Sequence, residues 1–368
     1  QQYLRHGPAS KHGVSGGFNI RSVIQRTDSC NVSGVALGYD KRLLHKSYLT
    51  MLYRPHFRRI PLFMLPFFAM ALLSGRPALA QPLPDPDQLR LASATAAVAR
   101  LGDAEPLFQK HAAQPVPIAS VTKVMTAMVV LDSGAGLDEW VEILERDTPA
   151  PANAWSRLRI GSEARRRDLL HISLMSSENL ASHVLARHYP GGTPAFVKAM
   201  NDKAEALGMH QTRFVDATGL SSANVSTAAD LLKMVQAAHD YPLIRELSTS
   251  GGFHVTFRNP RYTLGYGNTN RLVHADSWGV SLSKTGYLTE AGRCLVMVAD
   301  IDGEPTAMVF LDSLGTRTPL GDAGRVRRWL TTGDGGSVAG AALAYEQERT
   351  ARFNGTGVGG VRQVAERE

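Results

Sequence analysis

The chain has 368 residues and a formal net charge of +7, and 43% of its residues are hydrophobic. The excess charge lies in residues 1–80, which hold 11 Lys/Arg and 2 Asp/Glu, whereas residues 81–368 hold 29 Lys/Arg and 31 Asp/Glu. The basic character of the whole chain therefore gives no reason to expect a nucleic-acid partner or strong binding to anionic lipid.

The first 80 residues are expected to lie outside the folded domain. Residues 1–50 show no hydrophobic periodicity, and we interpret them as disordered translation of sequence upstream of a start at Met51. Residues 51–80 have the pattern of a secretory signal peptide, with arginines, an apolar run over 60–73, and Ala78-Leu79-Ala80 as a small-x-small cleavage site. The apolar run is shorter than the roughly 20 residues of a membrane-spanning helix. The sequence thus predicts export to the periplasm, with at most peripheral membrane contact.

Cysteine usage fits an exported chain without disulfides. Cys30 lies upstream of the expected start, so Cys294 is the single cysteine of the expected mature protein. Stability must then come from a buried core. A domain of about 250 residues is large enough to bury one without cross-links.

The spacing of apolar residues predicts one α+β domain over residues 81–331. The clearest helix covers 118–131, where residues 121, 124, 125, 128 and 129 form one apolar stripe. The other expected elements, in chain order, are a short helix or strand over 89–100, a strand over 105–110, helices over 168–189, 194–207 and 227–239, strands over 253–257, 280–286, 294–300 and 306–311, and a helix over 326–330. This order fits a helical lobe packed on a mostly antiparallel sheet. Residues 332–368 are glycine-rich and are expected to be a disordered tail.

A first chemical motif, Ser120-Val121-Thr122-Lys123, begins the helix over 118–131. Positions i and i+3 share a helix face, so the Lys123 amine can reach the Ser120 hydroxyl. A serine is a poor nucleophile until a base takes its proton, and a lysine can be that base when burial lowers its pKa. By itself the motif is better explained as an ordinary capped helix with a solvated lysine.

A second motif, Ser177-Glu178-Asn179, places a hydroxyl and an amide two residues apart. On a tight loop the hydroxyl can pass a proton to a leaving amine, while the amide holds a substrate carbonyl or the lysine. Alone, the tripeptide is better explained as helix capping.

A third motif, Ser283-Lys284-Thr285-Gly286-Tyr287, falls on a predicted strand. An edge strand can pair with an extended peptide, and a lysine and a threonine can bind a terminal carboxylate. Gly286 leaves room for close approach of the substrate. The alternative is a strand end with Lys284 in solvent.

In this order and combination, the three motifs form the signature of class A β-lactamases and penicillin-binding proteins, although Ser-Glu-Asn stands here in place of Ser-Asp-Asn. The segment 117–128 resembles the D-alanyl-D-alanine carboxypeptidase and endopeptidase family of low-molecular-mass penicillin-binding proteins. Within that family the likeness is greatest to the D,D-endopeptidase branch, of the penicillin-binding protein 7 type. The resemblance extends over roughly residues 100–331 and includes 216–220, where Ala217 replaces the family's usual proline, 224–228, and 290–294.

The resemblance implies the penicillin-binding and β-lactamase-like α+β fold, with no cofactor and no metal. It implies hydrolysis of peptidoglycan stem peptides through an acyl-enzyme and covalent inhibition by β-lactam antibiotics. The implied roles are Ser120 as nucleophile, Lys123 as general base, Ser177 as proton relay to the leaving amine, Asn179, Lys284, Thr285 and Gly286 as substrate-binding residues, and the N–H groups of Ser120 and Tyr287 as the oxyanion hole.

Three alternatives to a D,D-endopeptidase fit the sequence less well. A β-lactamase needs a glutamate-held water, and no Glu-x-x-Leu-Asn segment follows Asn179. A D-alanyl-D-alanine carboxypeptidase is the nearer rival, but residues 332–368 are too few for a second β-rich domain and carry no basic amphipathic stripe. Lys284 is the one cation assigned by motif to the leaving-group end, which favours a bulky leaving strand over free D-Ala. A catalytically silent wall-binding module would be expected to lose one of the motifs.

Overall fold

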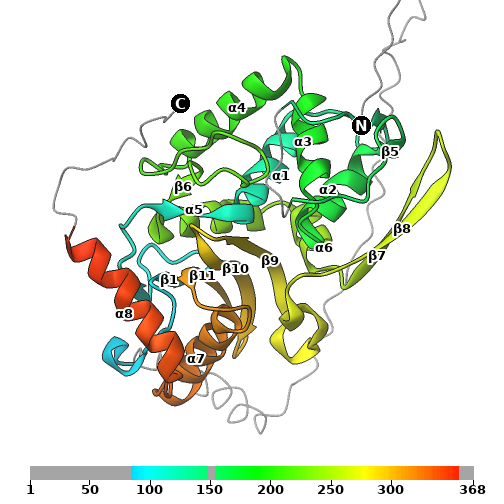
Figure 1. Ribbon diagram of the computed structural model, residues 1–368. Coiled ribbons are helices and arrows are strands. Elements are labelled where there is room, and N and C mark those ends of the chain that lie inside the picture. The colour runs from blue at the N-terminus through cyan, green and yellow to red at the C-terminus, as the bar shows by residue number, and fades with distance from the viewer. Residues whose placement is uncertain (1–83, 148–153, 356–368) are drawn as a thin grey trace, which may run out of the picture. The chain divides into compact units, whose positions relative to one another are not determined.

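The central element of the fold is a five-stranded antiparallel sheet in the order β2-β1-β11-β10-β9 (Figure 1). The computed structural model describes residues 84–147 and 154–355, so the predicted signal peptide and the residues before it lie outside it. Three long strands follow one another at the C-terminal end of the domain, and the N-terminal strands add beside them, with Thr95 opposite Leu311. β9 is therefore an edge strand. The strands are β1 Thr95–Arg100, β2 Phe108–Lys110, β9 Val280–Leu288, β10 Gly292–Ile301 and β11 Glu304–Ser313.

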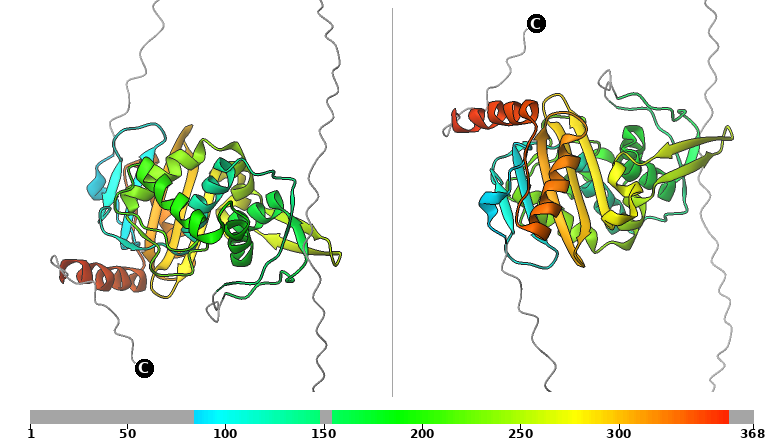
Figure 2. Two further views of the ribbon diagram at one scale, coloured as in Figure 1. Left: turned by 90° about the horizontal axis from the view of Figure 1, so that it is seen from above. Right: turned by 90° about the horizontal axis from the view of Figure 1, so that it is seen from below.

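Both faces of the sheet are covered, which explains the almost continuous apolar sequence of its middle strands. Successive residues of β10 point to opposite faces. Val296 joins the apolar cluster that includes helix α5 (Ala228–His239), and Leu295 joins the cluster that includes helix α7 (Thr318–Thr332). Figure 2 shows the order across the domain, from the cyan N-terminal strands through the orange and yellow strands to the green helices.

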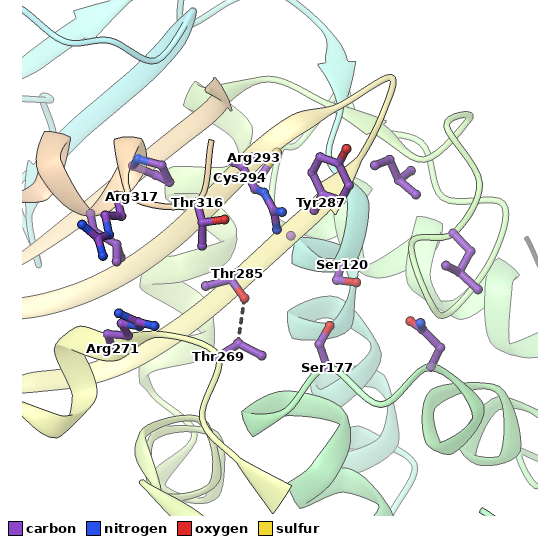
Figure 3. A pocket seen from close by; sticks show the side chains of 16 residues that line it. Ser120, Ser177, Thr269, Arg271, Thr285, Tyr287, Arg293, Cys294, Thr316 and Arg317 are labelled. Atoms are coloured by element: carbon purple, nitrogen blue, oxygen red, sulfur yellow. Dashed lines mark hydrogen bonds between the residues drawn. The ribbon is translucent and has the colours of Figure 1, made fainter. Parts of the chain in front are cut away.

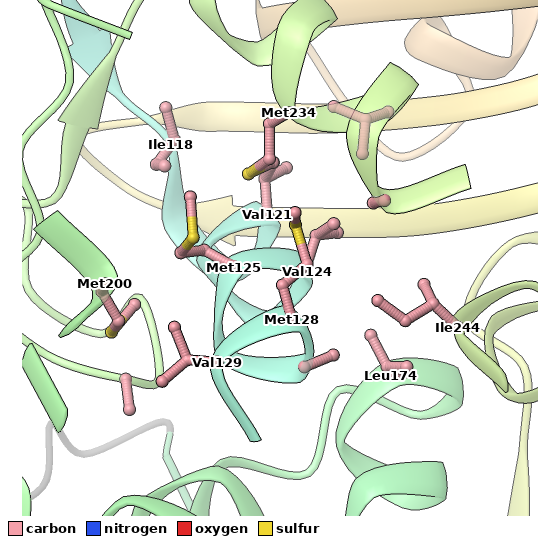
Figure 4. Close-up of a cluster of buried hydrophobic side chains, with 14 of the residues drawn as sticks. Ile118, Val121, Val124, Met125, Met128, Val129, Leu174, Met200, Met234 and Ile244 are labelled. Atoms are coloured by element: carbon pink, nitrogen blue, oxygen red, sulfur yellow. The ribbon is translucent and has the colours of Figure 1, made fainter. Parts of the chain in front are cut away.

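Helix α1 (Thr122–Asp132) forms the centre of a helical lobe. Its residues from Thr122 to Val130 are all buried, so the helix is enclosed on every side and not only along the predicted stripe. Figure 4 shows Met125 and Met128 among apolar side chains of the neighbouring elements. Enclosure makes α1 a rigid base for the side chains at its start. The other helices around it are α2 Arg166–Met175, α3 Asn179–Arg187, α4 Gly192–Ala206 and α6 Pro242–Thr249.

Several short elements complete the domain. The hairpin β7–β8 projects from the body (Figure 1), and two further strand pairs are β3 with β6 and β4 with β5. The bounds are β3 Val116–Pro117, β4 Trp140–Glu142, β5 Glu163–Arg165, β6 Val225–Ser226, β7 Gly252–Phe257, β8 Tyr262–Gly267, and the 3-10 helices η1 Pro86–Gln88, η2 Ala119–Val121, η3 Arg271–His274 and η4 Asp276–Trp278.

The predicted α+β architecture is confirmed, and the differences are local. The single helix expected over 168–189 is two helices, because Ser177 adopts a left-handed conformation with φ of 62° and breaks it. Helix α6 and strand β8 were not predicted. Within the described ranges, no helix combines the length and apolarity needed to cross a membrane.

The prediction of a disordered tail from residue 332 is wrong for residues 340–355, which form helix α8 (Gly340–Gly355). The helix is fastened to the sheet through the buried carboxylate of Asp312. The Tyr345 hydroxyl donates to Asp312 Oδ1 at 2.7 Å, and Arg349 Nε donates to Oδ2 at 2.5 Å. A second ion pair joins Glu346 to Lys110 on β2 at 2.9 Å. The prediction of disorder rested on the glycine content of this segment. The helix was not recognised because it is held by polar contacts and has no apolar periodicity.

Candidate active site

Ser120 lies in η2, at the junction between β3 and α1, with its backbone enclosed by two glycines from other elements. A Cβ on Gly219 would lie 2.0 Å from the carbonyl oxygen of Ala119, and a Cβ on Gly286 would lie 3.1 Å from the amide nitrogen of Ser120. Ala119 itself has a positive φ of 49°. The loop around Gly219 therefore approaches the serine backbone more closely than any side chain would permit, and strand β9 at Gly286 leaves only a tight fit for one.

The Lys123 amine connects the first two motifs. Its Nζ lies 2.9 Å from Ser120 Oγ, 2.7 Å from Asn179 Oδ1 and 2.5 Å from the carbonyl oxygen of Thr218. The side chain is completely buried, and the three acceptors account for all the hydrogen bonds that an ammonium group can donate. The predicted contact between Lys123 and Ser120 is thus present in the structure.

Burial lowers the pKa of Lys123 from 10.5 to about 7, against the opposing charges of Asp216 and Glu178 and with a small contribution from Arg146 in the same direction as burial. A neutral amine keeps two N–H groups and gains a lone pair. In that form it can donate to Asn179 and Thr218 and accept the proton of the Ser120 hydroxyl. The amine can therefore act as a general base near neutral pH.

Ser177 and Asn179 reach the same place from the connection between α2 and α3. Glu178 accepts a hydrogen bond from the Leu180 amide at 3.0 Å and so caps α3. This cap, with the left-handed Ser177, fixes the turn, and both Ser177 and Asn179 line the cavity next to Ser120 (Figure 3). Glu178, which stands where the motif Ser-Asp-Asn has aspartate, is thus the capping residue of α3.

The loop from 215 to 224 supplies a contact that the sequence did not reveal. The Asp216 carboxylate accepts hydrogen bonds from the amides of Thr218, Gly219 and Ser221 at 2.6, 2.6 and 2.8 Å. These bonds hold the loop so that the Thr218 carbonyl faces Lys123. The sequence does contain an Asp-x-Thr-Gly turn pattern at this loop, which resembles the pattern of the family. None of its side chains takes part in the chemistry, so the pattern did not point to the Thr218 carbonyl.

The loop is also fixed to the helix that carries Ser120. Asn224 Nδ2 donates to Thr122 Oγ1 at 3.0 Å, and Thr126 Oγ1 donates to the carbonyl of Ala217 at 2.7 Å. Ala217 thus contributes through its backbone, which a proline would also present.

Strand β9 carries the third motif along the cavity. Thr285, Gly286 and Tyr287 line it, and the Thr285 hydroxyl donates to Thr269 Oγ1 at 2.7 Å. Lys284 differs from the expectation of an accessible cation, because it is 1% exposed and its Nζ donates to the Thr285 carbonyl at 2.8 Å. Burial, and then the charge of Lys123, hold the pKa of Lys284 well below its usual value.

The cavity beside Ser120 has a volume of about 590 Å³ and is positively charged. Three arginines line it and no Asp or Glu does, as Figure 3 shows for its labelled residues. These arginines come from η3, β10 and the start of α7. Arg293 lies in the segment 290–294 that carries the family resemblance, whereas no motif pointed to Arg271 or Arg317. The lining residues are Ser120, Ser177, Asn179, Leu220, Thr269, Arg271, Thr285, Gly286, Tyr287, Leu288, Arg293, Cys294, Thr316, Arg317, Pro319 and Leu320.

Other chemistries find less support in the described part of the chain. There, no group of three or more His, Cys, Asp or Glu residues is placed to hold a metal ion. Cys294 is buried at the cavity wall, and burial raises its pKa to about 12, so it stays a thiol.

Comparison with known proteins agrees with this geometry. A family model described as D-alanyl-D-alanine carboxypeptidase, peptidase family S11, matches residues 85–315. The chain is 44% identical to the D-alanyl-D-alanine endopeptidase of Escherichia coli K12, over 81% of this chain and 98% of that protein. It is 49% identical to the D-alanyl-D-alanine endopeptidase of Pseudomonas aeruginosa, over 72% of this chain and 85% of that one.

A solved structure shows the same fold. Penicillin-binding protein D2 from Listeria monocytogenes, in its ampicillin-bound form, superposes with a TM-score of 0.56 at 28% identity. The superposition covers 64% of this chain and 95% of that one. The predicted penicillin-binding type of α+β fold is confirmed.

Proposed function

This chain belongs to the S11 family of D-alanyl-D-alanine carboxypeptidases and is a serine peptidase of that type, and we propose that it hydrolyses peptidoglycan cross-links as a D,D-endopeptidase with Ser120 as nucleophile. The observation that carries the assignment of the nucleophile is the 2.9 Å contact between Ser120 Oγ and a completely buried Lys123 amine. Burial keeps this amine near the pKa that general-base catalysis needs at neutral pH.

In the first half of the reaction, Ser120 Oγ attacks the carbonyl carbon of a D-alanine residue while neutral Lys123 takes the hydroxyl proton. The carbonyl oxygen becomes an oxyanion, which the N–H groups of Ser120 and Tyr287 stabilise. The close approach of Gly286 to the Ser120 amide supports this pairing of donors. One such donor is typically worth about 3 kcal/mol to the transition state.

Collapse of the intermediate breaks the C–N bond and leaves an acyl-enzyme. The leaving nitrogen needs a proton, and Ser177 passes it from the Lys123 ammonium. Asn179 holds the lysine and the substrate amide during this transfer, and Thr285 binds the carboxylate next to the scissile nitrogen. Water then attacks the ester and gives its proton to Lys123, which restores the serine hydroxyl.

Two observations favour the endopeptidase over the carboxypeptidase alternative. The relatives of 44% and 49% identity are both D-alanyl-D-alanine endopeptidases. The cavity of about 590 Å³ continues past Thr285, and a volume of this size can hold a peptide strand as well as a single amino acid. The expectation of a single cation at the leaving-group end is wrong, because Arg271, Arg293 and Arg317 line the cavity, so the number of cations no longer favours the endopeptidase.

We further propose that the enzyme acts in the periplasm, with residues 51–80 as its signal peptide and 81–331 as its peptidase domain. The arginine, apolar and small-x-small pattern of Met51 to Ala80 supports export. β-Lactams are proposed as covalent inhibitors, since the Listeria protein of the same fold has been solved with ampicillin and with cefotaxime bound.

The test is to incubate the purified protein with cross-linked muropeptide dimers, with monomeric pentapeptide and with a labelled penicillin. We expect dimers to be cleaved with a kcat/KM at least about tenfold above that of D-Ala release, a difference of roughly 1.4 kcal/mol. The Ser120→Ala variant should show neither activity nor a penicillin adduct in its intact mass.

Faster D-Ala release than dimer cleavage would assign the enzyme to the carboxypeptidases. An adduct that persists in folded Ser120→Ala protein would show that another residue is the nucleophile.

A further inference from the structure

The cavity extends beyond the residues that acylation needs, and its far end is cationic. Arg271 and Arg317 line the same cavity as Ser120, with no acidic residue among the lining side chains. In Figure 3, Thr285 lies between Ser120 and these two arginines. Both therefore lie past the proposed binding point for the carboxylate on the carbon next to the scissile nitrogen.

Neither arginine is neutralised by the protein. Within residues 84–147 and 154–355, no carboxylate lies within ion-pair distance of Arg271 or Arg317, whereas Arg325 on the same helix α7 pairs with Asp322 at 2.9 Å. The third arginine of the cavity, Arg293, lies over the ring of Tyr287, 3.9 Å from its centroid. Two guanidinium groups thus face the cavity with their hydrogen-bonding capacity open to a ligand.

The backbone of Arg271 is held firmly. It is the first residue of η3, and the buried Asn270 before it donates from Nδ2 to Ser283 Oγ of β9 at 2.9 Å and accepts from the Leu272 amide at 3.0 Å. Thr269 is bonded in turn to Thr285. The exposed side chain of Arg271 is therefore presented from a loop fixed to the strand that binds substrate.

Arg317 is held at the start of α7. It is the N-cap residue of that helix, and its carbonyl accepts a hydrogen bond from the Gly321 amide at 2.9 Å. A side chain mounted on a packed helix loses less freedom when it binds a ligand than one on a loose loop.

The two possible leaving groups differ in where they carry negative charge. Released D-Ala has one carboxylate, on the carbon next to the scissile nitrogen. A cross-linked strand leaves through a side-chain amine and so retains its own C-terminal carboxylate several bonds farther away. Guanidinium groups bind carboxylates with paired, charge-assisted hydrogen bonds.

We propose that Arg271 and Arg317 form a second anion subsite, beyond Thr285, that binds the C-terminal carboxylate of the leaving strand and so makes cross-linked dimers the preferred substrate. This inference rests on the proposed endopeptidase function and names the part of the substrate that the enzyme distinguishes. D-Ala alone is too short to reach both Thr285 and this subsite.

The test compares the full-length mature protein with its Arg271→Gln/Arg317→Gln double variant on three reactions. We expect kcat/KM for dimers to fall at least about tenfold, while D-Ala release from pentapeptide and acylation by a labelled penicillin stay within about twofold. Arg90→Gln is the matched control, because Arg90 is an exposed arginine that does not line the cavity.

A modified substrate separates recognition of the carboxylate from a general effect of charge. Dimers with the C-terminal carboxyl of the leaving strand amidated should be cleaved by the wild type as slowly as the double variant cleaves normal dimers, and the variant should lose nothing further on them. The subsite would be overturned if the double variant lost as much kcat/KM on pentapeptide as on dimers. It would also be overturned if the variant were as impaired relative to the wild type on amidated dimers as it is on normal dimers. A wild type that releases D-Ala but leaves dimers intact would overturn the endopeptidase function together with it.

Discussion

The Lys123 amine makes the rate of acylation depend on pH, and the structure predicts that this rate falls as the pH is lowered. Since burial lowers the pKa of Lys123 to about 7, the group is mostly protonated below that pH and mostly neutral above it. Only the neutral form can take the Ser120 proton, so the rate of acylation by penicillin should fall about tenfold per pH unit below 7 and level off above it. Lys123→Arg should abolish acylation while the protein stays folded, because a guanidinium keeps its proton.

Two neighbouring charges allow a check of this assignment. The Glu178 carboxylate raises the pKa of Lys123, and the Arg146 guanidinium lowers it. Glu178→Gln should therefore move the acid limb of the acylation profile to lower pH, and Arg146→Gln should move it to higher pH. The glutamine side chain of the first variant still offers an oxygen to cap α3. A limb that stays in place in both variants would mean that a group other than Lys123 titrates.

Gly219 illustrates how a residue without a side chain can control the nucleophile. Its φ of 77° disfavours any other residue, and a Cβ there would also lie 2.4 Å from the carbonyl carbon of Ala119. Gly219→Ala should displace the Ser120 backbone and lower acylation at least about a hundredfold. Penicillin labelling of the soluble, folded variant measures the effect.

Gly303, in the turn between β10 and β11, is the matched control for that substitution. Its φ is 83°, but a Cβ there would meet nothing within 4 Å. Gly303→Ala should therefore carry only the backbone strain, about 1 kcal/mol of unfolding free energy, with normal acylation. If Gly219→Ala and Gly303→Ala lost acylation to a similar extent, the loss could not be explained by a clash between a Cβ at position 219 and Ala119.

At the level of elements, helix α8 is expected to contribute to the free energy of unfolding because its side chains neutralise the carboxylate of Asp312. This carboxylate is 1% exposed, and its described side-chain partners are Tyr345 and Arg349 of α8. Deleting residues 340–368 would remove both partners of this carboxylate, and we expect a cost of about 3 kcal/mol in unfolding free energy. Urea denaturation of the full and shortened proteins measures this difference.

Asp312→Asn in the shortened protein should recover part of the loss, since it removes the charge that has lost its partners. Asparagine also tolerates the left-handed conformation at this position, where φ is 53°. A shortened protein as stable as the full chain would show that α8 is not docked in solution.

Elements with a repeating apolar pattern could be predicted from sequence, and those held by polar contacts could not. The strands β9, β10 and β11 alternate or run apolar, and their positions were recognised. Helix α8 is attached through Asp312 and Lys110, residues that give no periodic signal. The break between α2 and α3 depends on one backbone angle at Ser177, in a stretch whose apolar spacing continues across it.

At the level of the whole molecule, the motifs located most of the site, but residues joined only by tertiary structure were missed. Lys123 and Ser120 are three positions apart, and their pairing follows from helix geometry. Thr218 contacts Lys123 through its backbone carbonyl, from 95 positions away along the chain. A backbone contact of this kind cannot be predicted from the type of residue. Arg271 and Arg317 meet at one cavity because η3 packs on β9 and α7 packs on β10.

The three acceptors around the Lys123 amine also bear on folding kinetics. They lie 3, 56 and 95 positions away along the chain, so the burial that lowers the pKa of Lys123 is complete only after the helical lobe and the loop around Gly219 have assembled. In a chain that is not yet folded, or is trapped as a partly folded intermediate, Lys123 is an ordinary protonated lysine and Ser120 does not react with penicillin. We therefore expect penicillin labelling during refolding to count only molecules in which these long-range contacts around Lys123 have formed.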